Sequence, residues 1–128
     1  MLASMDEPEH FEILEDHAVF RPTGQLSVEL VVQLIATAIA FARERGIRKL
    51  LVDTSNLTGF EPPNIVKRYF FVHELARSSA GVVHVAFVVR SEFLDRQKLG
   101  RTIATKFGFT TDVFKTEGEA LVWLRRLN

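Results

Sequence analysis

The sequence predicts an α/β fold in which a five-stranded mixed sheet combines with four helices in the order ββαβαβαβα. Short apolar runs alternate with segments of helical periodicity along most of the chain. Two short strand-like segments precede the first helix, which indicates an antiparallel hairpin joined to an otherwise parallel sheet. With 128 residues, 47% of them hydrophobic and 25% charged, the chain suits one domain with one core. Residues 1–128 are therefore expected to form a single domain, with 1–9 as a flexible tail.

The hairpin is expected at the start of the domain. Residues 11–15 and 18–21 are the two strands, and Asp16 and His17 form the turn between them. The Pro-Thr-Gly sequence at 22–24 ends the second strand, because proline cannot donate to a strand ladder and glycine favours turns.

The first helix follows this turn. Ser27 is suited to cap its N-terminus, and a broad apolar face continues to about Arg45. Gly46 is expected just after the helix, where a left-handed backbone conformation is common. The apolar run at 50–52 then predicts a strand at 50–53 that is buried on both faces of the sheet.

The second helix is expected from about Pro62 to Arg77. Prolines at 62 and 63 would occupy its first turn and remove two N–H donors, which predicts a rigid start and a poor anion site. The residues at 82–89 are β-branched almost throughout, and they give the strongest strand prediction in the chain.

The last third of the chain predicts a helix, a strand and a helix. The third helix is expected from about Ser91 until Gly108, and the last strand at 110–114. The Thr-Glu-Gly-Glu sequence at 116–119 is a capping box, which predicts a terminal helix to about Leu127.

Composition excludes several classes of protein. Sixteen basic residues balance sixteen acidic ones, which argues against nucleic acid as a partner. No cysteine is present, so disulfides and zinc–thiolate sites are excluded. Neither a signal peptide nor a run of about 20 apolar residues is apparent, so we expect a cytoplasmic protein without membrane insertion.

The segment DTSNLTGFEPPN at 53–64 carries a resemblance to a known family. It resembles the turn of the STAS domain family, the anti-sigma factor antagonists and their SpoIIAA-like relatives, including the STAS/Sec14-type branch. Asp53-Thr54-Ser55 is similar to the Asp–apolar–Ser turn of that family, and Glu61 falls at its acidic position. Pro62 stands where relatives carry the serine that a partner kinase phosphorylates. The resemblance implies a STAS-like fold, here without the usual phosphorylation switch.

The expected function is a non-catalytic regulatory or protein-interaction domain that self-associates as a homodimer. Three groups of residues at the turn and on the second helix are candidates for its surface. Hydrogen bonds from Asp53, Ser55 and Asn56 would order the turn, Glu61 and Lys67 would supply charge at the rim, and Phe60, Phe70 and Phe71 would supply apolar contact. On a helical wheel, Ile65, Tyr69, Val72 and Ala76 share the core face and Phe71 falls nearly opposite.

The alternative function is binding of a small apolar or amphiphilic, lipid-like ligand. Eleven phenylalanines could line a cavity at the sheet edge, with Arg90 or Arg96 holding a polar head group. A cavity opening between the second and third helices would favour this alternative, and a filled surface there would favour the interaction domain. The four histidines show no metal-ligand spacing, and we expect neither an enzyme nor a cofactor.

Overall fold

The structure is a computed structural model that describes residues 6–94 and 99–127. The helices are α1 (Val28–Glu44), α2 (Ile65–Ser79), the short 3₁₀ helix η1 (Ser91–Phe93), α3 (Leu99–Lys106) and α4 (Glu117–Arg126). The strands are β1 (Phe11–Ile13), β2 (Ala18–Phe20), β3 (Gly24–Gln25), β4 (Lys49–Asp53), β5 (Leu57–Thr58), β6 (His84–Val88) and β7 (Thr111–Phe114). Within the described ranges, no helix is both long and apolar enough to cross a membrane.

The main sheet has five strands in the order β1-β2-β4-β6-β7. β1 pairs antiparallel with β2, and every other neighbouring pair is parallel. The register aligns Val19 with Leu51 and Leu51 with Ala86 across the three central strands. The α/β class, the mixed five-stranded sheet and the four α-helices predicted from the sequence are confirmed over the described part of the chain.

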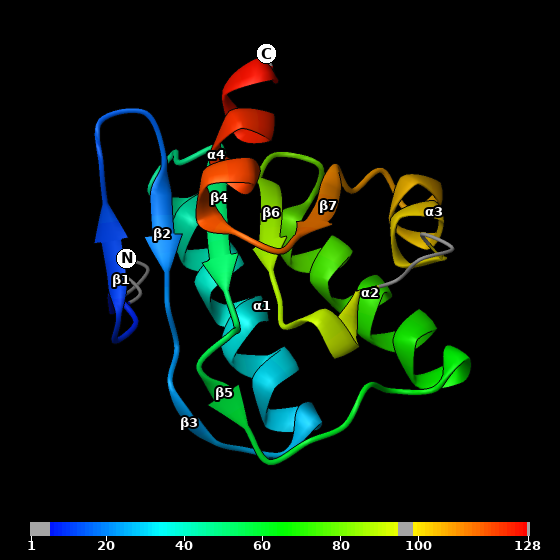
Figure 1. Ribbon diagram of the computed structural model, residues 1–128. Coiled ribbons are helices and arrows are strands. Elements are labelled where there is room, and N and C mark those ends of the chain that lie inside the picture. Colours follow the sequence, from blue (N-terminus) through cyan, green and yellow to red (C-terminus); the bar gives the residue numbers. More distant parts are fainter. Residues whose placement is uncertain (1–5, 95–98, 128) are drawn as a thin grey trace.

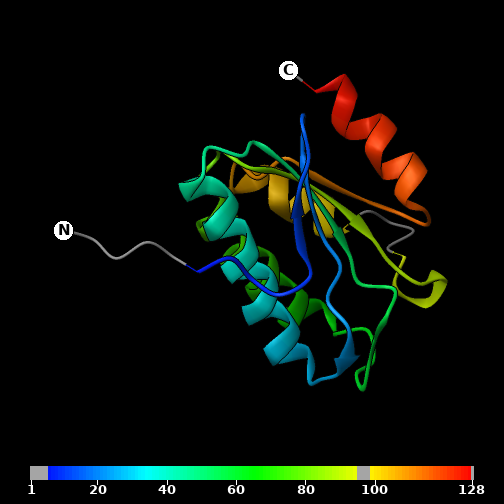
Figure 2. The same ribbon diagram turned by 90° about the vertical axis from the view of Figure 1, so that its left-hand side faces the viewer.

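Helices cover both faces of this sheet (Figures 1 and 2). α1, α2 and α3 lie on one face, and α4 lies alone on the other. Alternate strand residues therefore enter different cores: Leu50 and Val52 join the larger core under α1 and α2. Leu51 joins a smaller core under α4, together with Leu124. A strand buried on both faces must be apolar at successive positions, as in residues 50–52.

A second, two-stranded sheet pairs β3 with β5 in parallel, and the sequence analysis did not predict it. Both strands have only two residues, too short for a strand pattern. Beside them Gly59 has a φ of +97°, and a Cβ there would lie 3.0 Å from the backbone nitrogen of Leu26 and 3.1 Å from its carbonyl oxygen. The close approach of two backbones therefore requires glycine at this turn.

The second helix begins later than predicted. α2 starts at Ile65, and the side chain of Asn64 accepts a hydrogen bond from the Lys67 N–H at 2.8 Å. Glu61 and Pro62 each precede a proline and are therefore disfavoured in helical conformation, and Asn64 caps the helix with an extended backbone, so both prolines lie before it. The prediction that Pro62 and Pro63 occupy the first helical turn is wrong, and so is the inference drawn from it about missing donors.

The third helix does not start at Ser91 as predicted. η1 ends at Phe93, and Leu94 has an extended backbone with φ −68° and ψ 129°. The centre of the Phe93 ring lies 5.2 Å from that of Phe60. This contact with a distant turn outweighs the local helical propensity of the segment. α3 begins at Leu99 in the described part of the chain.

Candidate functional site

The turn after β4 begins with a buried carboxyl group. Side chains alternate across the strand, so Asp53 lies on the α4 face with Leu51, and it is only 7% exposed. Its Oδ1 accepts hydrogen bonds from the Ser55 backbone N–H at 2.9 Å and from the Ser55 hydroxyl at 2.6 Å. The Thr54 N–H donates to the carbonyl of Val88 at 2.9 Å, which ties the turn to β6. This is an Asx-type turn, in which a carboxylate replaces a backbone acceptor.

Two residues from distant parts of the chain join Asp53 at this edge of the sheet. Arg21 follows β2, and Glu117 is the first residue of α4. The Arg21 guanidinium donates from Nε and Nη2 to the two carboxylate oxygens of Glu117, each at 2.8 Å. This forked pair is the strongest geometry for an arginine–carboxylate contact.

The two carboxyl groups differ in their pKa. Hydrogen bonds from Arg21 lower the pKa of Glu117 to about 2. Burial raises the pKa of Asp53, and so does its hydrogen bond with the Glu117 carboxylate. Asp53 therefore holds its proton more tightly than an ordinary aspartate, and Glu117 stays ionised.

Among the described residues, the serine hydroxyl at this edge of the sheet is engaged, and the histidines of β6 and α2 lie elsewhere. The Ser55 hydroxyl is held as a donor to Asp53. His84 lies at the opposite end of β6, and His73 packs against Phe107, with the ring centres 4.7 Å apart. Over residues 6–94 and 99–127, no three His, Asp or Glu side chains gather as metal ligands. The arrangement therefore orders the turn and joins β2 to α4.

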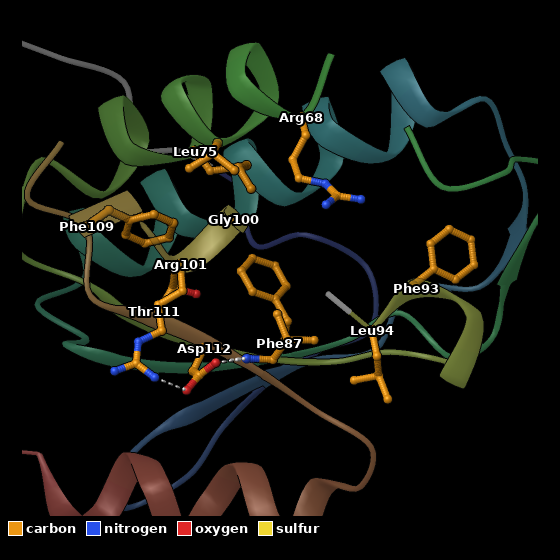
Figure 3. A pocket seen from close by; sticks show the side chains of 12 residues that line it. Arg68, Leu75, Phe87, Phe93, Leu94, Gly100, Arg101, Phe109, Thr111 and Asp112 are labelled. Atoms are coloured by element: carbon orange, nitrogen blue, oxygen red, sulfur yellow. Dashed lines mark hydrogen bonds and ion pairs between the residues drawn. The ribbon is translucent and has the colours of Figure 1, made fainter. Parts of the chain in front are cut away.

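A separate cavity of about 350 Å³ opens between α2, α3 and the opposite face of the sheet (Figure 3). We call it the α2–α3 pocket. Its described lining consists mainly of aliphatic and aromatic side chains, with a few polar ones at its edges. The lining residues are Arg68, Val72, Leu75, Phe87, Phe93, Leu94, Gly100, Arg101, Phe109, Thr111, Asp112 and Val113. Gly100 lies in the first turn of α3 and lines the cavity.

Most polar side chains of the pocket are already engaged. Arg101 pairs with Asp112 at 3.4 Å, and the Thr111 hydroxyl donates to the Val85 carbonyl at 2.7 Å. Arg68 donates to the Pro63 carbonyl at 3.5 Å, and its side chain extends from α2 toward the rings of Phe87 and Phe93 (Figure 3). The interior of the pocket thus offers apolar surface, and Arg68 offers positive charge beside it.

The exposure of several α2 residues differs from the prediction. Phe71 is half-buried, so the prediction that it faces solvent is wrong, whereas Phe70 is 63% exposed. Ile65 and Tyr69 were predicted on the core face, yet they are 65% and 39% exposed. The start of α2 extends past the strands of the main sheet (Figure 1), and the Tyr69 ring lies 5.6 Å from the ring of Phe107.

The remaining candidates are spread over several surfaces. Phe60 is half-buried and packs on Phe93, while Asn56 and Glu61 are exposed. Lys67 pairs with Glu29 of α1 at 3.5 Å.

Neither arginine proposed for the head group lines the described pocket. Arg90 lies with its guanidinium 5.3 Å from the centre of the Phe93 ring and is not among the lining residues. Arg96 lies outside the described residues.

Sequence reasoning missed Arg68 and the pair formed by Arg21 and Glu117. Arg21 directly follows a strand and Glu117 lies in a capping box, so both could have been placed at the carboxyl edge. Their contact spans 96 residues, and only the completed sheet brings them together. Arg68 carried a weaker signal, as a cation on the core-facing side of an aromatic helix.

Comparison of the chain with protein-family models, with curated proteins and with solved structures gave no significant match. The geometry of the described residues therefore carries the functional argument.

Proposed function

We propose that this chain is a non-catalytic, STAS-like binding domain whose α2–α3 pocket holds a small apolar or amphiphilic ligand. One observation carries the proposal: a cavity of about 350 Å³ lies between α2, α3 and the sheet. Well-packed interiors contain few voids larger than a water molecule. The volume falls at the lower end of the range for small-molecule sites, which suits a ligand smaller than a nucleotide cofactor.

The distribution of polar groups suggests an amphiphile with an anionic head. The guanidinium of Arg68 extends toward Phe87 and Phe93 and can bind a carboxylate through two parallel N–H donors (Figure 3). The aliphatic and aromatic floor beyond it suits a hydrocarbon tail. The guanidinium of Arg68 lies over the apolar lining, whereas Arg101 pairs with Asp112 at 3.4 Å, so we place the head group at Arg68 by its position.

The proposal also accounts for Pro62, which stands where STAS relatives carry their phosphorylated serine. A prolyl residue offers no hydroxyl group, so a switch in this chain needs another input. Occupancy of the pocket would supply one, because Val72 and Leu75 belong to the same helix that follows the altered turn.

The proposal is tested with anilinonaphthalene sulfonate, an anionic aromatic probe, and its displacement by dodecanoate. Val72→Phe fills the pocket from α2, and Val122→Phe makes the same change on α4, where Val122 is 52% exposed. We expect Val72→Phe to weaken dodecanoate binding roughly tenfold or more, about 1.4 kcal/mol, and Val122→Phe to leave it unchanged. Unaltered binding in Val72→Phe, or no saturable binding by the wild type, would overturn the proposal.

A second comparison tests the head group. We expect Arg68→Gln to weaken binding of dodecanoate while leaving dodecanol unaffected, since only the carboxylate can use the guanidinium. Equal losses for both ligands would contradict an anionic head at Arg68.

A further inference from the structure

α2 presents a stripe of exposed apolar residues over its first two turns, and among them Val66 and Phe70 lie opposite the pocket. The stripe consists of Ile65, Val66, Tyr69 and Phe70. Val66 and Phe70 are 65% and 63% exposed, and the rings of Tyr69 and Phe70 lie edge to face with centres 5.9 Å apart. The first turns of α2 lie at the outer margin of the molecule (Figure 1). Contiguous apolar residues of this kind mark an interaction surface more often than scattered ones do.

Charged residues flank the stripe in a self-complementary pattern. Lys67 and Glu74 lie on the same side of α2, because seven residues make almost two full turns. Phe70 lies between them along the helix axis. Their side chains are 56% and 50% exposed, and their pairs within the chain, with Glu29 and Arg77, are long and solvated. Such pairs contribute little and exchange readily for others.

We propose that a second copy of the chain docks on this stripe, with the two α2 helices antiparallel about a two-fold axis near Phe70. In such an interface each contact occurs twice with the partners exchanged. An axis midway between Lys67 and Glu74 places Lys67 of each copy beside Glu74 of the other. The same axis brings the two copies of Phe70 together. One dimer geometry therefore satisfies both the apolar and the charged contacts.

The exposed area predicts a reversible dimer. Tyr69 and Phe70 together expose on the order of 200 Å², and the aliphatic residues of the stripe add a similar amount. Each partner in a stable complex contributes about 800 Å². The stripe therefore supplies the centre of a small interface, and we expect dissociation in the micromolar range.

Sedimentation velocity of the intact chain, from low micromolar to near-millimolar concentration, tests the proposal. We expect the wild type to show a concentration-dependent dimer and Phe70→Glu to be monomeric throughout. Val122→Glu, on the opposite layer, is the matched control and should dimerise as the wild type does. A wild type that stays monomeric, or a dimer that survives Phe70→Glu, would refute the proposal.

Charge reversal tests the antiparallel geometry itself. Lys67→Glu alone and Glu74→Lys alone each place like charges together, and we expect the dimer dissociation constant to rise roughly tenfold. The double reversal restores opposite charges across the axis and should recover most of the lost affinity. No recovery in the double variant would exclude this pairing. Lys67 and Glu74 are not among the residues that line the pocket, so this result is independent of ligand binding.

Discussion

At the scale of single residues, the most informative feature is the contrast between Asp53 and Glu117. Both are carboxylic acids at the same edge of the sheet, yet the pKa of Asp53 is raised by burial and that of Glu117 is lowered to about 2 by Arg21. A carboxyl group that resists ionisation costs stability at neutral pH. Glu117 has the opposite effect on stability. Its pair with Arg21 stabilises the fold fully above the ordinary pKa of 4.5, and this stabilisation is lost as the pH falls toward 2.

Replacing Asp53 with asparagine should stabilise the protein at pH 7. The amide keeps an acceptor for Ser55 and offers Glu117 a donor without a proton that ionises. Asp53 retains its proton to higher pH in the native chain than in the unfolded one, so the wild type loses stability as the pH rises above 3.8. We expect Asp53→Asn to raise the free energy of unfolding by about 1 kcal/mol at pH 7.

Urea denaturation at several pH values measures this effect. The advantage of Asp53→Asn should shrink toward pH 4 and vanish below it. Ser55→Ala removes a hydrogen bond that holds the pKa of Asp53 down, so its loss of stability should grow as the pH rises above 3.8, opposite to the gain from Asp53→Asn. A constant difference between Asp53→Asn and the wild type would contradict the raised pKa.

At the scale of elements, side-chain caps determine where the helices begin. Ser27, Asn64 and Thr116 each accept a hydrogen bond from a backbone N–H three residues further on. Such a cap satisfies one of the N–H groups that a helix start leaves unpaired. The predicted caps Ser27 and Thr116 are confirmed. The helix that was expected to begin at about Pro62 instead begins after a cap at Asn64.

Asn64→Ala should therefore destabilise the protein, by about 1 kcal/mol. Pro62→Ala is the matched control, because Pro62 is exposed and precedes the helix. We expect the control to change the free energy of unfolding by less than about 0.5 kcal/mol. Thermal unfolding followed by circular dichroism compares them. A larger loss of stability in Pro62→Ala than in Asn64→Ala would mean that the prolines, and not Asn64, stabilise the start of α2.

At the scale of the whole molecule, one sheet joins two cores of unequal size. The larger core lies under α1 and α2, and the smaller one lies under α4. Successive residues of β4 enter both, with Val52 in the first and Leu51 in the second. Loss of either core would expose one apolar face of β4 to water. We therefore expect the domain to unfold as one unit.

Leu124→Ala tests this coupling from the side of the smaller core. Leu124 is fully buried, and we expect its truncation to cost about 2–5 kcal/mol. Trp123, the single tryptophan, reports on α4 by fluorescence, and far-UV circular dichroism reports on the whole chain. Both midpoints in urea should fall together, while Val122→Ala should leave them nearly unchanged. A fall in the fluorescence midpoint alone would mean that α4 unfolds separately.

Local sequence patterns determined the order of the strands and helices and two of the helix starts. Alternation of apolar runs with helical periods predicts the order of strands and helices, and the hydroxyl groups of Ser27 and Thr116 mark two helix starts. These signals lie within a few residues of the feature they define, so the sequence alone suffices. The same holds for the hydrogen bonds between Asp53 and Ser55, which span two positions.

Only the tertiary structure decided which surfaces are open and which residues meet. Helical periodicity indicates that one side of α2 is apolar, but the layer beneath it decides that Phe70 is exposed and Phe71 half-buried. The α2–α3 pocket is lined by residues from α2, η1, α3 and the sheet, and the pair of Arg21 with Glu117 depends on strand order across the sheet. Burial and long-range contact are properties of the packed chain, and no local pattern encodes them.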